Sequence, residues 1–442
     1  MGQKSDLFNT LEDIQKRAKK KGADQVRIVA SQSKRLSAGV ANGDVETIES
    51  KENSALNIEI YIGQKKSAVS IGLGKADLVE TALDEAIFNA KLQPDDPYTG
   101  LVDASELSDE YATLDIFDAK VPTVEELIEN AKEAGDTAFA ANKLIVRATS
   151  TAAWSAGSTA ILSSNGFSGY QERTRNSLMA MTVAEQNGQK NQGGEGDAQI
   201  YMGDLDSAEA IGLEAANSAI EGLNPRTVKP QRAEVILDPG VAAELVSTFI
   251  NAINSTNVVK EKTFLCTRLN QEVFAPAITI IDDPLIERSL GSRAYDIDGI
   301  AAKELVLVEN GVLKTWLFDA YDAREFNDKK GTSYKSTGHG GVGLEFYVAA
   351  GKTSPEQMIS EVKDGFYITS LMNLQVNGFD GSFSSPASGF WIENGKIAHA
   401  VDGASIGGNI MDVYKAMEPA SDLDRIHHQP VPTMRVGAMK IG

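Results

Sequence analysis

Asn-Gly pairs recur along this chain and constrain how it can fold. The dipeptide begins at residues 42, 165, 187, 310, 377 and 394. It is the strongest short signal for a tight turn between two antiparallel strands. Two of the pairs stand in similar surroundings, LVENGVLKTWL at 307–317 and WIENGKIAHAV at 391–401, where apolar and polar residues alternate on both sides. Because such alternation is typical of strands, the sequence predicts that most of its strands pair in an antiparallel manner.

Helices are expected mainly in the first half of the chain. Apolar residues recur at helical spacing near the amino terminus, starting at Leu7, and in the segments 76–92, 123–140 and 206–222. Thr123 and Glu126 are spaced as a capping box. The residues between these helices alternate as strands. We therefore expect an α+β fold in which an N-terminal antiparallel sheet is covered by helices on one face, followed by a β-rich second half.

The chain of 442 residues is too long for one ordinary hydrophobic core. Its clearest break is the proline-containing stretch GLNPRTVKPQRAE at 222–234. The sequence predicts an N-terminal α+β region at 1–225, with a further subdivision near residue 121 as an option, and a C-terminal domain at 232–442. The polar, glycine-rich stretch NQGGEGDAQ at 191–199 is expected to be a mobile loop.

The formal charge of −20 limits the partners of the chain. Nucleic-acid binding depends on neutralising phosphates with Lys and Arg, so we expect no direct contact with nucleic acid and favour cationic or neutral peptides. Cys266 is the only cysteine, which suits a reducing compartment. Because the sequence also lacks a signal peptide and any apolar run of about 18 residues, we expect a cytoplasmic protein without membrane contact.

A strand, a turn and a helix are predicted within residues 236–257, a common place to mount catalytic side chains. The helical part, Val241 to Asn254, has a continuous apolar face but neither histidine nor cysteine. The four histidines of the chain are His339, His399, His427 and His428, and no two are three or four residues apart, as they would be on a zinc-binding helix. We therefore expect no metal ligand in this chain.

Three other motifs have a structural alternative. Gly403–Gly407 matches the Gly-x-Ser-x-Gly nucleophile elbow around Ser405, but only 35 residues follow, too few for the rest of a hydrolase sheet. Asp282-Asp283-Pro284 reads as a strand-ending turn. GHGGVG at 338–343 is followed by a strand-like segment, not by the helix that a phosphate loop needs. We expect a flexible loop there, which could lie against a bound peptide backbone.

Phrases in both halves resemble the TldD/PmbA family, and more closely its PmbA (TldE) branch. In the second half they are KTFLC at 262–266, ITIIDDP at 278–284, VENGVLKTWLFDAYDARE at 308–325, STGHGG at 336–341, SGFWIENGKI at 388–397, GGNIMDVY at 407–414 and the terminal PTMRVGAMKIG. The first half agrees through GADQVRI, NGDVETIES and DDPYTGL. Within the branch, the chain departs at Ser385-Pro386, where Arg-Gly is usual, and at Asn373, where glycine is usual.

This resemblance implies a barrel-like C-terminal domain and a metallopeptidase-related function that has also been labelled modulation of DNA gyrase. TldD-type chains carry a His-Glu-x-x-x-His zinc helix. The corresponding helix here, Val241–Asn254, has only the isolated carboxylate of Glu244, so zinc is expected in a TldD-type partner and not in this chain.

The resemblance thus implies a subunit, not active alone, that binds extended peptides by strand addition for a TldD-type protease, as a heterodimer or larger assembly. The alternatives are a homodimeric peptide-binding or scaffold protein without a protease role, and an independent hydrolase. The candidate contacts with peptide or partner are Gly338, His339, Gly340, Gly341, Ser388 and Gly389.

Overall fold

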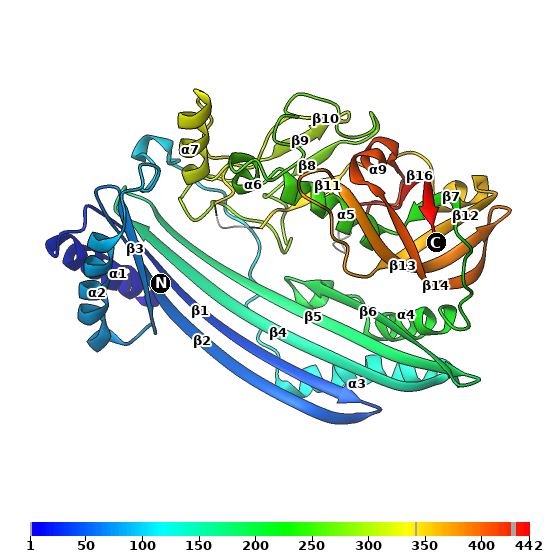
Figure 1. Cartoon of the computed structure of the whole chain (residues 1–442). Coiled ribbons are helices and arrows are strands. Elements are labelled where there is room, and N and C mark those ends of the chain that lie inside the picture. The colour runs from blue at the N-terminus through cyan, green and yellow to red at the C-terminus, as the bar shows by residue number, and fades with distance from the viewer. Residues whose placement is uncertain (1, 341–342, 426–429) are drawn as a thin grey trace.

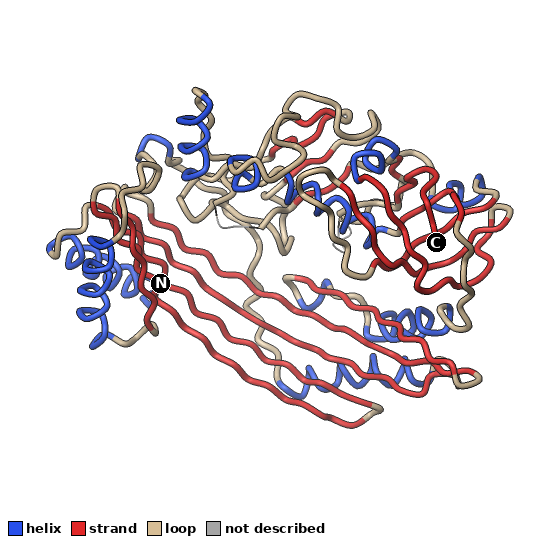
Figure 2. The backbone as a smooth tube through the Cα atoms, viewed as in Figure 1, coloured by secondary structure: helices blue, strands red, loops and turns tan. Residues whose placement is uncertain are grey.

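The chain folds into a curved N-terminal sheet with helices and a C-terminal region built around a small β-barrel (Figure 1; Figure 2). The computed structural model describes residues 2–340, 343–425 and 430–442. The expected α+β class is confirmed, with an antiparallel sheet in the N-terminal part and a β-rich, barrel-like C-terminal part. None of the helices within the described residues combines the length and apolar character needed to cross a membrane.

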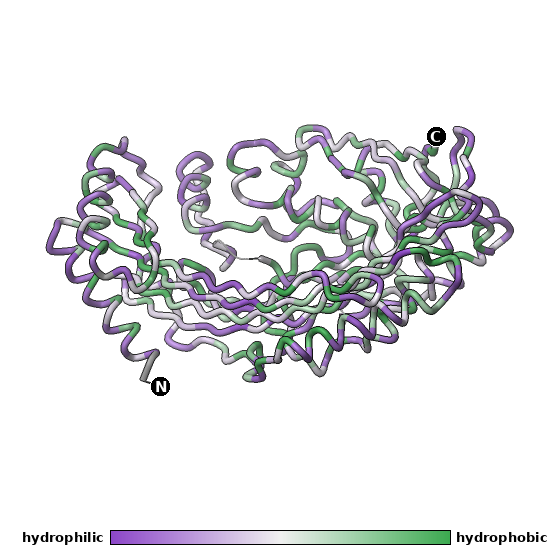
Figure 3. Tube along the Cα trace, turned by 90° about the horizontal axis from the view of Figure 1, so that it is seen from below, coloured by the Kyte–Doolittle hydropathy of each residue, from purple (hydrophilic) through white to green (hydrophobic). Residues whose placement is uncertain are grey.

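Six antiparallel strands form the N-terminal sheet in the order β3-β2-β1-β4-β5-β6. They are β1 (Gln25–Ala41), β2 (Asp44–Ile62), β3 (Lys65–Ile71), β4 (Ile145–Ser163), β5 (Ser168–Gln186) and β6 (Gln189–Gln199). Four of these strands are 17 to 19 residues long. Figure 3 shows the sheet as an arc whose inner side is turned toward the C-terminal region.

Helices cover one face of this sheet, as predicted. They are α1 (Gly2–Lys20), α2 (Val79–Leu92), α3 (Val124–Ala140) and α4 (Ala208–Glu221). Ile28 and Ala30 of β1 are buried in the core formed with α1 and α2, whereas Ala38 and Val40 belong to the core formed with α3 and α4. Because these four residues lie at alternate positions, all of the helices pack on the same face. Between the two cores, β1 is exposed at residues 32–35.

A five-stranded barrel forms the centre of the C-terminal region. Its strands follow in the order β14-β13-β12-β7-β16, and pairing of β14 with β16 closes the ring. They are β7 (Gln231–Leu237), β12 (Asp364–Leu371), β13 (Ser382–Glu393), β14 (Lys396–Asn409) and β16 (Met434–Ile441), with the short β15 (Glu418–Pro419) beside β16. Among the pairs of named strands that the structure describes, only β7–β12 is parallel.

A second, smaller sheet packs beside the barrel in the order β10-β9-β8-β11. Its strands are β8 (Ile280–Asp282), β9 (Leu305–Glu309), β10 (Val312–Leu313) and β11 (Phe346–Val348). The helices of this region are α5 (Pro239–Ala252), α6 (Ser255–Val259), α7 (Ala320–Lys330), α8 (Pro355–Glu361) and α9 (Ile410–Ala416). The largest hydrophobic core of the protein joins the barrel, the small sheet and α5.

Most of the Asn-Gly pairs form the predicted turns. In the pairs at 42, 187, 310 and 394, both residues have positive φ, between 49° and 88°, and each pair joins consecutive strands. These are the backbone angles that a tight turn of matching twist requires. The pair at 165 lies in the four-residue turn between β4 and β5, whereas the pair at 377 lies in the longer loop between β12 and β13. Thr123 also forms the predicted capping box with Glu126.

The stretch NQGGEGDAQ was expected to be a mobile loop, and this prediction is wrong. Residues 189–199 form β6, which pairs with β5 along its whole length. The glycines that suggested a loop allow α4 to pack closely, since a Cβ atom on Gly193 would lie 2.2 Å from the backbone nitrogen of Ala219. Glycine in a strand can mark such a close backbone approach instead of disorder.

Candidate functional site

The helix that could have carried a metal site is a core helix. Asp238 caps α5, accepting a hydrogen bond from the backbone N–H of Val241 at 2.7 Å. The predicted apolar face is buried, and Phe249 at its centre packs edge-to-face against Phe274, with 4.9 Å between the ring centroids. Glu244 is the only ionisable residue in α5 and lies on its exposed side. The local sequence therefore forms the helix without giving it metal ligands.

Potential metal ligands do not gather elsewhere in the described part of the chain. No group of three His, Cys, Asp or Glu side chains there is arranged to hold an ion. Among the described carboxylates, His399 is near one only, with Nδ1 3.7 Å from Glu393. His427 and His428 lie outside the described residues. Because a catalytic zinc needs about three protein ligands, the described residues do not fit a zinc site.

The best-defined polar site surrounds the glycine-rich loop after α7. Of the four loop residues proposed from the sequence, Gly338, His339 and Gly340 are described, whereas Gly341 lies outside the described residues. Gly338 has a φ of +78°, which favours glycine. The His339 side chain is turned inward and is only 5% exposed. The described part of the expected flexible loop is therefore packed down on its neighbours.

Asp282, at the end of β8, holds this histidine. Its Oδ2 lies 2.9 Å from His339 Nε2 and 2.5 Å from an Nη atom of Arg293, and its Oδ1 accepts a hydrogen bond from the Glu345 N–H at 2.8 Å. His339 Nε2 also lies 3.0 Å from the Arg293 guanidinium, and Nδ1 lies 2.9 Å from the Thr337 hydroxyl, so both ring nitrogens have polar partners. The strand end predicted at Asp282-Asp283-Pro284 is present, but Asp282 is fully buried.

The protonation state of Asp282 follows from its surroundings. Burial acts to raise the pKa of the Asp282 carboxyl, but the hydrogen bond from His339 and the charge of Arg293 outweigh it and hold the pKa below its ordinary value. Arg293 also donates to the Gly343 carbonyl at 3.0 Å. The negative charge of Asp282 and the positive charge of Arg293 therefore compensate each other within the site, and the glycine-rich loop is hydrogen-bonded to both side chains.

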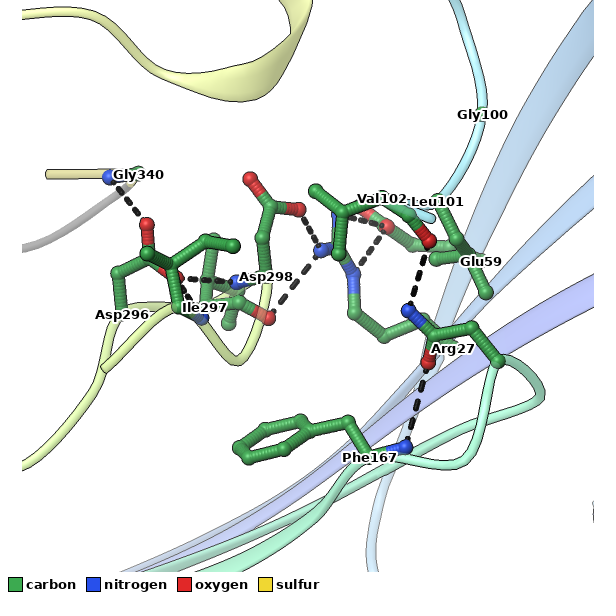
Figure 4. A network of polar contacts seen from close by, with 12 residues as sticks. Arg27, Glu59, Gly100, Leu101, Val102, Phe167, Asp296, Ile297, Asp298 and Gly340 are labelled. Atoms are coloured by element: carbon green, nitrogen blue, oxygen red, sulfur yellow. Dashed lines mark hydrogen bonds and ion pairs between the residues drawn. The ribbon is translucent and has the colours of Figure 1, made fainter. Parts of the chain in front are cut away.

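A second carboxylate holds the other side of the loop (Figure 4). Asp296 Oδ2 accepts a hydrogen bond from the Gly340 N–H at 3.0 Å, and its Oδ1 accepts from the N–H groups of Asp298 and Ile300. Burial, followed by the nearby charge of Asp298, raises the pKa of Asp296 to about 6. A Cβ atom on Gly340 would lie 2.9 Å from Asp298 Oδ2, so a larger residue at this position would displace the Asp298 carboxylate.

Arg27 connects this carboxylate loop to the N-terminal sheet (Figure 4). The guanidinium is buried on β1, donates to Glu59 at 2.8 Å and to the Ile297 carbonyl at 3.2 Å, and pairs with Asp298. The Tyr61 hydroxyl donates to the same Glu59 carboxylate. A chain of contacts therefore runs from the sheet through residues 296–298 to the glycine-rich loop.

The remaining candidate contacts, Ser388 and Gly389, lie elsewhere, on barrel strand β13. The Ser388 hydroxyl donates to Asp402 at 2.6 Å. Gly389 lies at a bulge, where a Cβ atom would approach the Tyr367 carbonyl to 2.1 Å. No hydrogen bond among the described residues joins them to Gly338, His339 or Gly340. Their contact with peptide or partner stays a prediction.

The Gly-x-Ser-x-Gly motif around Ser405 does not form a nucleophile elbow. Ser405 is an exposed residue within β14. Its backbone pairs with Gly442, and it does not lie at a strand-to-helix turn.

Three charged residues of the site, Arg27, Arg293 and Asp296, were not predicted from the sequence. The contacts that join these residues to the loop or to the sheet are made with residues at least 11 positions away, so no local pattern in the sequence indicates them.

Comparison with known protein families matches most of the chain. The PmbA/TldA metallopeptidase central domain matches residues 117–223, and the PmbA/TldA metallopeptidase C-terminal domain matches residues 230–442. The Escherichia coli O157:H7 protein named metalloprotease PmbA is 29% identical over 397 residues, covering 89% of this chain and 86% of that protein. A metalloprotease PmbA homolog from Buchnera aphidicola is 27% identical over 423 residues, with 95% and 93% covered.

Solved structures share the fold over nearly the full length. TldE from Thermococcus kodakarensis superposes with a TM-score of 0.86 at 22% identity, covering 98% of this chain and 99% of that chain. A candidate modulator of DNA gyrase from Bacteroides thetaiotaomicron superposes with a TM-score of 0.91 at 22% identity, with 98% and 97% covered. The N-terminal sheet and the C-terminal barrel are therefore a recurring arrangement.

Proposed function

The chain belongs to the PmbA/TldD family of metallopeptidase-related proteins, and from this premise we propose that it is a non-catalytic, TldE-type subunit. In this role it binds extended peptides for a zinc-bearing TldD-type partner and does not cleave them by itself. The observation that carries the proposal is the composition of α5. Its inward side chains complete the main hydrophobic core, and its one carboxylate, Glu244, points away from it.

The small sheet supports the peptide-binding part of this proposal. β11 lies at the edge of that sheet, directly after the glycine-rich loop. A pocket of about 200 Å³ beside it is lined by Ile286, Leu290, Leu344, Phe346 and Tyr347, among others. The Val348 N–H already bonds the Pro430 carbonyl at 2.8 Å, so an added peptide strand would pair with backbone groups around Phe346. Apolar side chains of the peptide would enter the pocket.

The test compares the purified chain, a TldD-type protein and their mixture. We expect a stable complex on gel filtration, zinc in the partner only, and chelator-sensitive cleavage of a labelled peptide that is strongest in the mixture. Ser405→Ala should leave this cleavage unchanged. Full peptidase activity from the isolated chain, insensitive to chelators, would contradict the proposal. A stable homodimer that ignores the partner would favour the scaffold alternative instead.

A further inference from the structure

The two faces of the N-terminal sheet differ in charge. We define the inner face by the odd-numbered residues of β1, β2, β4 and β5 and the even-numbered residues of β3 and β6, which the strand register places on one side. This side is turned to the C-terminal region, because Arg27 bonds the Ile297 carbonyl and Arg173 bonds the carbonyls of Leu290 and Ser292. The helices pack against the opposite, outer face.

Basic residues are concentrated on the inner face, although the chain as a whole has a charge of −20. Apart from the bulged hairpin end at 40–46, this face has eight basic and three acidic residues. The basic ones are Arg27, Arg35, Lys51, Lys66, Arg147, Arg173, Arg175 and Lys190, and the acidic ones are Glu49, Glu59 and Glu185. On the outer face, acidic strand residues outnumber basic ones: Glu52, Glu172, Glu195 and Asp197 against Lys34 and Lys65.

Several inner-face arginines are not neutralised within the described chain. Lys51 pairs with Glu49 and Lys190 with Glu185, while Arg27 and Lys66 share Glu59. No carboxylate among the described residues lies within ion-pair distance of the other arginines, which are Arg35, Arg147, Arg173 and Arg175. Arg173 is bonded to the carbonyls of Leu290 and Ser292, whereas Arg35, Arg147 and Arg175 are exposed and can pair with groups outside the chain.

Small residues form a trough between these arginines. In the register, Arg35 of β1 and Arg175 of β5 both face Ser155 of β4, one from each side. Two strand spacings separate them, or about 10 Å between backbones. A pocket of about 390 Å³ lies over this part of the face and is lined by Ser33, Ser155, Gly157, Thr159, Gln171, Arg173 and Arg175, among others. One extended chain fits along such a floor, with an arginine on either side.

We propose that this inner-face trough binds an acidic stretch of extended polypeptide. The inference rests on the proposed peptide-binding function and adds a substrate class to it. Guanidinium groups bind carboxylates through strong, charge-assisted hydrogen bonds, and the Ser, Thr and Gln side chains of the floor can bond a peptide backbone. At physiological salt, charges beyond about 8 Å are largely screened, so the local arginines outweigh the distant negative charge once a peptide is seated.

Single-stranded nucleic acid fits the trough less well. Its sequence-tolerant binding uses aromatic side chains on which bases stack, and none of the described residues lining this pocket is aromatic. The phosphates of a nucleic acid would also extend beyond the trough, where the negative charge of the protein would repel them.

Fluorescence anisotropy with the intact chain tests the proposal. The probes are labelled peptides of one length in which Ser alternates with Glu, Gln or Lys, and a single-stranded oligonucleotide. We expect the Glu peptide to bind most tightly, with an affinity that falls as salt rises. The double variant Arg35→Gln/Arg175→Gln should bind it at least about tenfold more weakly, while Lys34→Gln, next to Arg35 but on the outer face, should bind it as wild type.

The proposal is overturned if the Glu and Gln peptides bind equally well, or if the oligonucleotide binds more tightly than either. It is also overturned if no probe binds, or if Lys34→Gln weakens binding of the Glu peptide as much as the double variant does. Circular dichroism and thermal midpoints of the variants show whether each remains folded. The binding assay needs neither a partner nor cleavage. Its failure is therefore distinct from the absence of partner-dependent proteolysis, which would contradict the proposed function.

Discussion

His339 Nε2 lies 2.9 Å from Oδ2 of Asp282, so the glycine-rich loop after α7 is bonded to the end of β8 through two buried side chains. The two residues are 57 positions apart in the sequence. Arg293 binds the same carboxylate oxygen, which gives the loop one anchor shared by three side chains.

Replacing Asp282 with alanine should lower the free energy of unfolding by about 3–5 kcal/mol, because Arg293 would remain buried without its counter-charge. Chemical denaturation measures this loss. Asp283→Ala is the matched control, since Asp283 is partly exposed and pairs with the partly exposed Arg425. Similar losses of stability in both variants would show that the buried Asp282–Arg293–His339 cluster stabilises the fold no more than an ion pair at the surface does.

Arg27→Met should also destabilise the protein by about 3–5 kcal/mol, because it leaves the Glu59 and Asp298 carboxylates without their buried partner. Hydrogen exchange should become faster at residues 296–300, which Arg27 holds against the sheet. Lys51→Met, on the same face but in an exposed pair with Glu49, should change neither measurement. Unchanged exchange at 296–300 in Arg27→Met would argue against the connection between sheet and loop.

Phe249→Ala should cost about 3–5 kcal/mol of stability, as expected for a fully buried aromatic side chain. Thermal or chemical unfolding tests this prediction. Phe379, which is 74% exposed, provides the control, and its replacement with alanine should change stability by less than about 0.5 kcal/mol. If Phe249→Ala is as stable as wild type, α5 is not the core helix described above.

Alanine substitutions at two glycines distinguish the effect of backbone strain on stability from the effect of a steric clash. Gly188→Ala places alanine at a φ of +80° in open space and should cost about 1–2 kcal/mol. Gly311→Ala pays the same strain at +82°, and its Cβ atom would also meet the Phe274 carbonyl oxygen at 2.5 Å, so it should cost clearly more. Denaturation midpoints of the two variants decide this, and equal values would mean that the backbone near Phe274 moves aside freely.

Asp296 should make stability depend on pH. The folded protein holds the pKa of Asp296 near 6, above its ordinary value in the unfolded chain, so the folded state binds this proton more tightly. The resulting stabilisation is complete below the ordinary pKa of about 4 and is lost as the pH rises through 6. Between pH of about 4 and 7, wild type should lose roughly 2 kcal/mol relative to Asp296→Asn.

Unfolding curves of both proteins across this pH range measure the difference. Asp238, whose pKa burial also raises to about 6, is present in both and cancels. A constant difference between wild type and variant across the range would contradict the raised pKa.

Local signals explain the parts of the fold that were predicted correctly. The turn at Asn42-Gly43 and the cap at Thr123 depend on residues a few positions apart, so the sequence states them directly. The apolar stripe of α5 likewise needs only helical periodicity to be recognised. β6 was missed because its glycines are required by the packing of α4, a contact that no neighbouring residue indicates.

By itself, the sequence determined most of the hairpins, the N-terminal helices and α5, the α+β class and the family resemblance, because each depends on local periodicity or on phrases read in order. Only the tertiary structure decided which distant groups meet. Arg27 and Asp298 are 271 positions apart, and the barrel closes by pairing β14 with the terminal strand β16. The charge of the inner face belongs to this second class, since strand register sorts the arginines onto one side of a chain whose composition is acidic.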